Sequence, residues 1–216
     1  MADRDASSSS PSNPKYDFTE DWFSGYIPIW NEIVAQIKPS RILEIGSFEG
    51  RSTCYLIETS GASRDLEIHC VDTWEGGAEH RQIDMSGAEQ RFRKNTSLAV
   101  ASVKHKVELI IHKKPSFLAL AELVAAGRVS SFDMIYVDGS HQAPDVLADA
   151  VLSFHLLRTG GLLVFDDYLW SMEGPGKQDP FNMPKPAIDS FVNIYQRKLN
   201  ILSAQLYQLY AQKTAA

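Results

Sequence analysis

The stretch RILEIGSFEGRSTCYLIETSGASRDLEIHCVD, from Arg41 to Asp72, decides the fold of this chain. It contains an apolar run, a loop with Gly46 and Gly50, a helical pattern, and a second apolar run that ends at Asp72. Strand, glycine loop, helix, strand and acid in this order are typical of a nucleotide-type cofactor site at the edge of a parallel sheet. The glycines let the backbone approach a ligand closely, and the last carboxylate can accept hydrogen bonds from the two hydroxyls of a ribose.

The loop itself favours one kind of cofactor. A dinucleotide fingerprint reads G-x-G-x-x-G and presents bare amides to a pyrophosphate. Here the spacing is Gly46-x-x-x-Gly50, with Glu44 two residues before the first glycine and Glu49 inside the loop. A carboxylate at ~4 Å from a pyrophosphate would cost about 1 to 4 kcal/mol. A cofactor with a cationic end suits the loop better, and S-adenosylmethionine has an ammonium, a sulfonium, a ribose diol and no phosphate.

Length and composition indicate one globular domain. The chain has 216 residues, of which 44% are hydrophobic and 22% charged, so it can bury a substantial core. A net charge of −6 without any basic run disfavours a nucleic-acid partner. No apolar stretch reaches the ~18 residues of a membrane span, and no secretory signal is visible. Cys54 and Cys70 lie in apolar segments, which is typical of reduced core cysteines, so we expect a cytoplasmic protein.

The N-terminal part divides into two segments. Residues 1–14 are polar and rich in Ser and Pro, and we predict a disordered tail. Residues 15–38 form a helical segment, because apolar side chains recur at helical spacing from Phe18 to Ile37, with Pro28 interrupting the pattern. We expect this segment to pack on the core, and the alternative is a cap over the cofactor pocket. Residues 39–216 form the main domain.

Within the main domain, strand and helix patterns alternate. The pattern predicts strands at 41–45, 66–71, 107–111, 133–137 and 162–165, helices at 51–59, 87–100, 117–126, 144–157 and 185–197, and two closing strands within 199–213. Gly160-Gly161 is expected to turn the chain into the strand at 162–165. Such alternation implies an α/β fold with a mostly parallel sheet and right-handed crossovers. Ligands of these sheets bind beyond the carboxyl ends of the strands.

Three carboxylates follow two of these strand ends. Asp138 follows the strand at 133–137, and Asp166 and Asp167 follow the strand at 162–165. If the two strands are neighbours, the three acids meet and repel one another. A hard divalent cation removes this repulsion, and ligation by oxygen alone favours Mg²⁺ over Zn²⁺. The alternative is that Asp138 caps a turn while the other two acids bind substrate or solvent.

Other strand ends carry further candidates. His141 lies in the loop before a helix and is a candidate general base, since its pKa suits removal of a proton from a hydroxyl; it could equally be a loop histidine bonded to the backbone. His112 is a weaker candidate. Ser116 and Phe117 follow the third strand, where a hydroxyl and a ring can meet an adenine. Trp74 could pack on the same cofactor, and either aromatic residue could instead belong to the core.

Taken together, four motifs resemble class I S-adenosylmethionine-dependent methyltransferases. They are LEIGSFEG at 43–50, VD at 71–72, VDGSH at 137–141, and the run from Gly160-Gly161 to Asp166-Asp167. The chain is most similar to the methyltransferase domain 24 group, which is similar to the catechol O-methyltransferase-like enzymes. The resemblance covers roughly residue 39 to the C-terminus.

The resemblance implies a Rossmann-like, doubly wound, seven-stranded sheet whose last strand is antiparallel, with residues 199–213 as the closing strands. It also implies the cofactor site. The expected cofactor-binding residues are Glu44, Gly46, Ser47, Gly50, Asp72, Thr73, Trp74, Ser116, Phe117 and Asp138.

The resemblance further implies a metal site. The catechol-type enzymes hold Mg²⁺ with Asp, Asp and Asn, and the corresponding residues here are Asp138, Asp166 and Asp167. Three acids are similar instead to the metal-dependent O-methyltransferases that modify sugars of natural products. The catechol-type base is a lysine three residues after the first metal ligand, and His141 stands at that position, which disfavours a catechol substrate.

The expected reaction is metal-assisted O-methylation of a small molecule. With Mg²⁺ at Asp138 lowering the pKa of an acceptor hydroxyl, His141 would remove the proton and the oxygen would attack the sulfonium methyl in line. The Gly- and Pro-rich loop at 171–186 would shape the acceptor pocket. Alternatives are a metal-independent methyltransferase acting on an amine, an NAD-dependent oxidoreductase, a non-catalytic cofactor-binding domain, and a methyltransferase acting on RNA or protein. Apolar residues of the N-terminal segment hint at a homo-oligomer.

Overall fold

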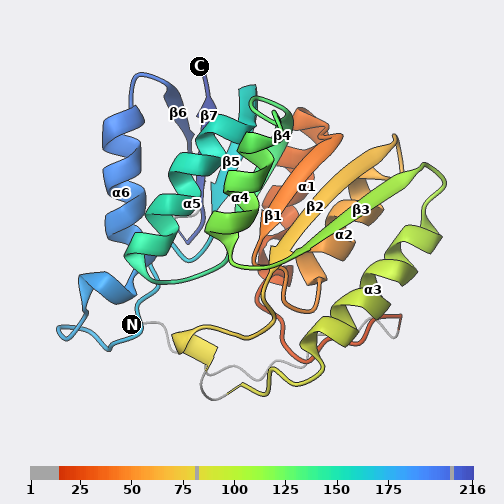
Figure 1. The fold of residues 1–216 in the computed structure, drawn as a ribbon, viewed down its shortest axis with the longest axis horizontal. Helices are drawn as coiled ribbons and strands as arrows, with labels where there is room; N and C mark the ends of the chain where they lie inside the picture. The colour runs from red at the N-terminus through yellow and green to blue at the C-terminus, as the bar shows by residue number, and fades with distance from the viewer. Residues whose placement is uncertain (1–14, 81–82, 205–206) are drawn as a thin grey trace.

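A computed structural model describes residues 15–80, 83–204 and 207–216 of the chain. A seven-stranded sheet forms its centre, in the order β3-β2-β1-β4-β5-β7-β6 (Figure 1). The strands are β1 (Arg41–Ile45), β2 (Leu66–Asp72), β3 (Val107–Lys113), β4 (Phe132–Val137), β5 (Leu157–Phe165), β6 (Leu199–Leu202) and β7 (Leu209–Lys213). The first five run parallel, and β7 is antiparallel to both β5 and β6. The predicted Rossmann-like fold, including its antiparallel closing strands, is thus confirmed.

Helices cover both faces of the sheet. They are α1 (Ile27–Ile37), α2 (Arg51–Ser60), α3 (Ala88–Ser102), α4 (Ser116–Ala125), α5 (Ala143–Leu156) and α6 (Pro184–Tyr195), with the short 3-10 helices η1 (Ser24–Tyr26), η2 (Ala78–His80) and η3 (Pro180–Asn182). Helices α4, α5 and α6 contribute to one core cluster, and α1, α2 and α3 to the other. Figure 1 shows the first set in front of the sheet. The central parallel strands β1, β4 and β5 are therefore buried on both sides, whereas the edge strand β3 is only partly buried.

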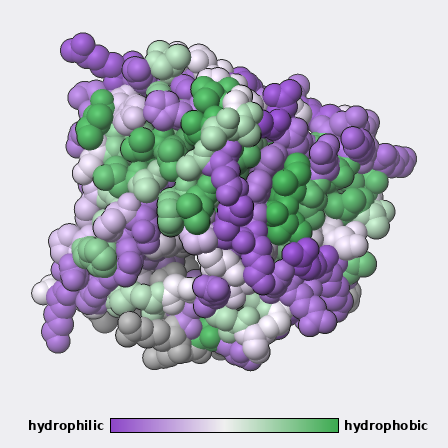
Figure 2. Space-filling model, in the orientation of Figure 1, coloured by the Kyte–Doolittle hydropathy of each residue, from purple (hydrophilic) through white to green (hydrophobic). Residues whose placement is uncertain are grey.

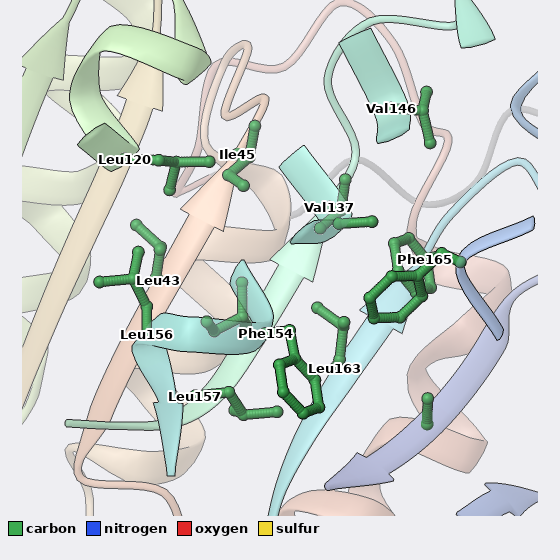
Figure 3. Packing of buried hydrophobic residues seen from close by; sticks show 14 of the residues in the cluster. Leu43, Ile45, Leu120, Val137, Val146, Phe154, Leu156, Leu157, Leu163 and Phe165 are labelled. Atoms are coloured by element: carbon green, nitrogen blue, oxygen red, sulfur yellow. The ribbon is translucent and has the colours of Figure 1, made fainter. Parts of the chain in front are cut away.

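The core beneath α4 and α5 shows how the strands contribute. In Figure 3, Ile45, Val137 and Phe165 project from the ends of β1, β4 and β5 on the same side as Leu120 of α4 and Phe154 of α5. All five side chains are at most 5% exposed. Burial of such a side chain is worth about 1.5–3 kcal/mol, so this cluster fixes the strand ends that carry the polar residues.

The N-terminal segment differs from its prediction in one respect. A helix over the whole of 18–37 is not formed, because α1 begins only at Ile27 and Pro28 lies in its first turn, where its missing N–H costs nothing. Residues 15–23 instead form an irregular segment of turns and bends ahead of η1, and we call this segment the strap below. The predicted tail at 1–14 lies outside the described residues.

β5 also begins earlier than predicted. The pairing between β4 and β5 is irregular between Phe132 and Met134, so Gly160 and Gly161 lie within the strand instead of ahead of it. Gly160 adopts a φ of +81°, and a Cβ on Gly161 would lie 2.9 Å from the carbonyl oxygen of Asp133. The two glycines therefore carry the strand through an irregular pairing that a side chain would obstruct.

The surface adds two observations. Figure 2 shows that the face carrying α4 and α5 mixes hydrophobic and hydrophilic side chains. In the described part of the chain, no helix is both long enough and apolar enough to cross a bilayer.

Candidate functional site

The glycine loop after β1 is shaped to admit a ligand. Gly46 has a φ of +83°, and a Cβ there would lie 1.8 Å from the carbonyl oxygen of Asp138 at the end of β4. No other residue type fits between these two strand ends. The Asp72 carboxylate, at the end of β2, accepts the N–H groups of Ser47 (2.9 Å) and Phe48 (2.8 Å) through Oδ2 and of Trp74 (2.7 Å) through Oδ1. Asp72 thus fixes the loop as well as lining the cavity above it.

Glu44 occupies a different place from the one predicted. It is fully buried beneath the loop, where the hydroxyls of Ser47 (2.7 Å), Ser52 (2.6 Å) and Thr53 donate to its carboxylate. Burial raises the pKa of Glu44, and these hydroxyls oppose that rise. Glu44 does not line the cavity, so its prediction as a direct cofactor contact is corrected: it braces the loop from below.

Two further predicted contacts belong to the framework. Gly50 precedes α2 with a φ of +82°, and a Cβ there would lie 2.9 Å from the ring of Phe92. Trp74 is 7% exposed, packs on Phe92 with ring centroids 5.1 Å apart, and donates its indole N–H to the carbonyl of Phe48 (2.7 Å). Neither residue lines the cavity. Both residues support the loop, and for Trp74 this agrees with the alternative that it belongs to the core.

A cavity of about 650 Å³ opens above the carboxyl ends of β1, β2, β4 and β5. Its volume is in the usual range for small-molecule sites. The predicted residues that line it are Gly46, Ser47, Asp72, Thr73, Ser116, Phe117, Asp138, His141, Asp166 and Asp167. The structure therefore brings together the glycine loop, Ser116 and Phe117 at the start of α4, and the strand-end acids.

The α4 end of the cavity holds Ser116 and Phe117, the predicted adenine contacts. Phe117 is 53% exposed, which is unusual for a phenylalanine and leaves its ring available to a ligand. Behind Ser116 lies Asp149 of α5, which is 1% exposed. Burial raises the pKa of Asp149 to about 7, and a hydrogen bond from Ser116 opposes that rise. A buried acid thus supports this end of the cavity.

The acids after β4 and β5 meet as predicted, but as a pair. Burial and the charge of Asp166 raise the pKa of Asp138 well above its usual range. Burial and the charge of Asp167 raise the pKa of Asp166 to about 6. The hydroxyl of Tyr136, which is fully buried in β4, donates to Asp166, and Gln208 donates to that hydroxyl (3.4 Å). This network holds Asp166 in place beside Asp138.

Asp167 takes another direction. Its φ is +51°, and its Oδ2 lies 2.8 Å from Nε2 of His141. The His141 ring stacks on Trp170, with centroids 4.2 Å apart and an interplanar angle of 28°. His141 and Asp167 both line the cavity. His141 and Asp167 therefore form one acid–base pair at the cavity wall.

The donor set bears on the predicted metal site. Among the residues that the structure describes, no three His, Cys, Asp or Glu side chains are placed as a ready cluster around one ion. Asp167 departs from the predicted triad because it faces His141. The remaining pair, Asp138 and Asp166, still fits a hard cation, since burial and the charge of Asp166 raise the pKa of Asp138 and Mg²⁺ is commonly held by one or two carboxylates and several waters.

The sequence did not predict the path of the strap or the Glu49 contacts that hold it. Glu49 is 1% exposed, and its carboxylate accepts the N–H (2.6 Å) and hydroxyl (2.7 Å) of Thr19 and pairs with Arg91 (2.5 Å). The strap thereby reaches the cavity, where Trp22 lines the wall. His80 also lines the cavity. Only the position of Glu49 inside the glycine loop signalled any of this.

His112 has no place in the site. Its Nε2 lies 2.9 Å from Nδ1 of His69, and Nε2 of His69 lies 2.9 Å from Glu67. Neither histidine lines the cavity. Burial lowers the pKa of both imidazoles, that of His69 to about 4, so they form a neutral hydrogen-bonded pair within the fold.

Comparison with known proteins places the chain in a family. Residues 43–168 match the family model described as a methyltransferase domain. Uncharacterized protein R132 of Acanthamoeba polyphaga mimivirus is 26% identical over 129 residues, which are 58% of this chain and 50% of that protein. The chain thus spans about half the length of this curated relative.

Solved structures agree on the fold. The O-methyltransferase TomG from Streptomyces achromogenes, involved in tomaymycin synthesis and solved with S-adenosylmethionine, aligns over 90% of this chain and 82% of its own, with a TM-score of 0.64 and 19% identity. The O-methyltransferase from Bacillus cereus, solved with S-adenosylhomocysteine, aligns over 91% and 84%, with a TM-score of 0.59 and 17% identity. With a family match over more than half of its length, this chain belongs to the methyltransferase domain family.

Proposed function

We propose that this protein transfers a methyl group from S-adenosylmethionine to a hydroxyl of a small molecule, assisted by a divalent cation. One observation carries the proposal: a single cavity joins the Gly46 loop and Asp72 to the His141–Asp167 pair. Methyl transfer needs a donor site and a proton acceptor within one enclosed space, because the rate depends on positioning two bound reactants.

At the donor end, the loop supplies room and polarity. Gly46 leaves space for the cofactor between β1 and β4, and Asp72 is placed to accept hydrogen bonds from a ribose while its other contacts hold the loop. Ser116 and Phe117 would receive the adenine. When bound, S-adenosylmethionine supplies the methyl group as part of a sulfonium, and the cation would lower the pKa of the acceptor hydroxyl.

At the acceptor end, the chain's own groups manage the proton. Asp138 and Asp166 would hold the cation, and Tyr136 keeps Asp166 oriented. The His141–Asp167 pair would take the hydroxyl proton as the acceptor oxygen forms its bond to the methyl carbon and the carbon–sulfur bond breaks. The products are a methyl ether, S-adenosylhomocysteine and a proton.

Calorimetric titration of Mg²⁺ into protein saturated with S-adenosylhomocysteine tests this proposal. The variants are Asp166→Asn and, as a matched control, Glu32→Gln at an exposed position of α1. One saturable site that is present in the wild type and the control but lost in Asp166→Asn supports metal-assisted O-methylation. If S-adenosylhomocysteine binds but Mg²⁺ gives no heat, the cation has no part in the mechanism, and an amine becomes a candidate acceptor again. Failure to bind S-adenosylhomocysteine at all would refute the proposal.

A further inference from the structure

Three aromatic side chains from separate segments form one wall of the cavity. Trp22 of the strap stacks on Phe48 of the glycine loop (centroids 5.0 Å, 28°) and on His80 of η2 (5.8 Å, 29°). The rings of Phe48 and His80 are nearly parallel, with an interplanar angle of 2° and centroids 6.3 Å apart. All three line the cavity, and Trp22 keeps 40% of its surface exposed. We call this group the aromatic wall.

The wall is held in place from behind. Glu49 joins the strap to the glycine loop through Thr19, and Asn95 of α3 donates its amide to the backbone carbonyls of Asp17 (2.9 Å) and Glu49 (3.0 Å). These contacts hold the strap, which carries Trp22, against the glycine loop, which carries Phe48. Rings fixed in this way present flat apolar surface to a ligand at low cost in conformational entropy.

The charge of the cavity is one-sided. Among the described residues that line the cavity, acids outnumber Lys and Arg side chains. The acids are Glu20, Glu49, Asp72, Asp138, Asp145, Asp166 and Asp167, and the bases are Arg51 and Lys114. Arg91 neutralises Glu49, and a divalent cation would neutralise Asp138 and Asp166. The carboxylates of Glu20 and Asp145 stay unneutralised whether or not that cation is bound.

The two bases are already engaged elsewhere. Arg51 donates to the carbonyl of Glu20 (2.9 and 3.1 Å), lies 3.4 Å from Asp21, and covers the ring of Phe18. Lys114 pairs with Glu122 of α4 at 2.7 Å. A phosphate or carboxylate near the strap would therefore meet the Glu20 carboxylate while both lining bases are already paired, and like-charge contacts disfavour such a ligand.

We infer that the acceptor is an uncharged or cationic ring-bearing alcohol, and that the cavity rejects acceptors carrying phosphate, carboxylate or coenzyme A. This inference rests on the proposed function and names its substrate class. The aromatic wall supplies affinity for a ring, and the unneutralised acids supply the selection against anions.

Binding of three probe phenols to the holoprotein tests the inference without requiring turnover. The probes are 4-methylphenol (neutral), tyramine (cationic) and 4-hydroxybenzoate (anionic), each titrated calorimetrically into protein saturated with S-adenosylhomocysteine and Mg²⁺. The neutral and cationic probes should bind about tenfold or more tightly than the anionic one. Equal or tighter binding of the anion, or no binding of any probe while S-adenosylhomocysteine binds, would overturn the inference. Loss of S-adenosylhomocysteine binding itself would instead refute the proposed function.

Single-residue variants test separately the affinity for a ring and the selection against anions. Trp22→Ala should weaken binding of 4-methylphenol about threefold to tenfold while S-adenosylhomocysteine affinity is kept. Glu20→Gln should reduce the discrimination against the anionic probe about threefold. Ile194→Ala, at a 76% exposed position of α6 outside the cavity, is the control and should change neither. Unchanged ring affinity in Trp22→Ala would refute the role of the aromatic wall.

Discussion

Replacement of Asp166 by asparagine should stabilise the folded protein at pH 8 while removing one of the two proposed cation ligands. Asp166 is 8% exposed, and burial together with the charge of Asp167 raises its pKa to about 6. Asparagine keeps the shape of the side chain. Its oxygen can accept the Asp167 N–H and its amide can donate to the Tyr136 hydroxyl, so the substitution removes the charge and keeps both contacts.

The magnitude follows from the pKa. An acid whose pKa is raised on folding holds its proton more tightly in the folded state, so stability falls as pH rises from about 4 to about 6 and is then constant. The difference between the ordinary value of 3.8 and about 6 corresponds to about 3 kcal/mol, at about 1.4 kcal/mol per pKa unit. That cost is present at pH 8 and is removed in Asp166→Asn.

Urea unfolding followed by tryptophan fluorescence measures the effect. In EDTA at pH 8, the free energy of unfolding of Asp166→Asn should exceed that of the wild type by about 3 kcal/mol, and at pH 4.5 the gain should shrink to about 1 kcal/mol. The exposed control Glu32→Gln should change by less than about 0.5 kcal/mol at either pH. A variant no more stable than the wild type at pH 8 would refute the reasoning.

Three further predictions follow from the site. Gly46→Ala should abolish S-adenosylhomocysteine binding in calorimetry and lower Tm, because its Cβ would collide with the Asp138 carbonyl; normal binding would contradict the placement of the loop. His141→Ala should lower kcat about 10²- to 10⁴-fold while the Kd of S-adenosylhomocysteine changes less than about twofold, and a parallel loss of affinity would indicate a structural role. Mg²⁺ should raise the Tm of the wild type at pH 8 and leave Asp166→Asn unchanged, whereas an equal rise in both would place the cation elsewhere.

The sheet could be predicted because its information is local. Each parallel strand is an apolar run followed by a polar residue or glycine, and burial on both faces requires that pattern. The convergence of Asp72, Asp138 and Asp166 on one edge then follows from topology alone. The two closing strands were visible as short apolar runs within 199–213, whereas their antiparallel ending was implied only by the resemblance to the methyltransferases.

Side-chain direction was not predictable in this way. Whether Glu44 faces the cofactor or the core depends on three hydroxyls that come to it from α2 and the loop. Asp167 turns to His141 because its backbone adopts a φ of +51°, which no local pattern indicates for an aspartate. The strap is held by Glu49, some 30 residues away along the chain, so its path depends on a tertiary contact that a local sequence pattern does not reveal.

The central claim is that the cavity above the strand ends binds S-adenosylmethionine. Calorimetric titration of S-adenosylhomocysteine into the wild type, Gly46→Ala and the exposed control Ile194→Ala tests it most directly. One site per chain in the wild type and in Ile194→Ala, lost in Gly46→Ala, is the predicted result. Absence of binding by the wild type, or binding that Gly46→Ala leaves intact, would contradict the account.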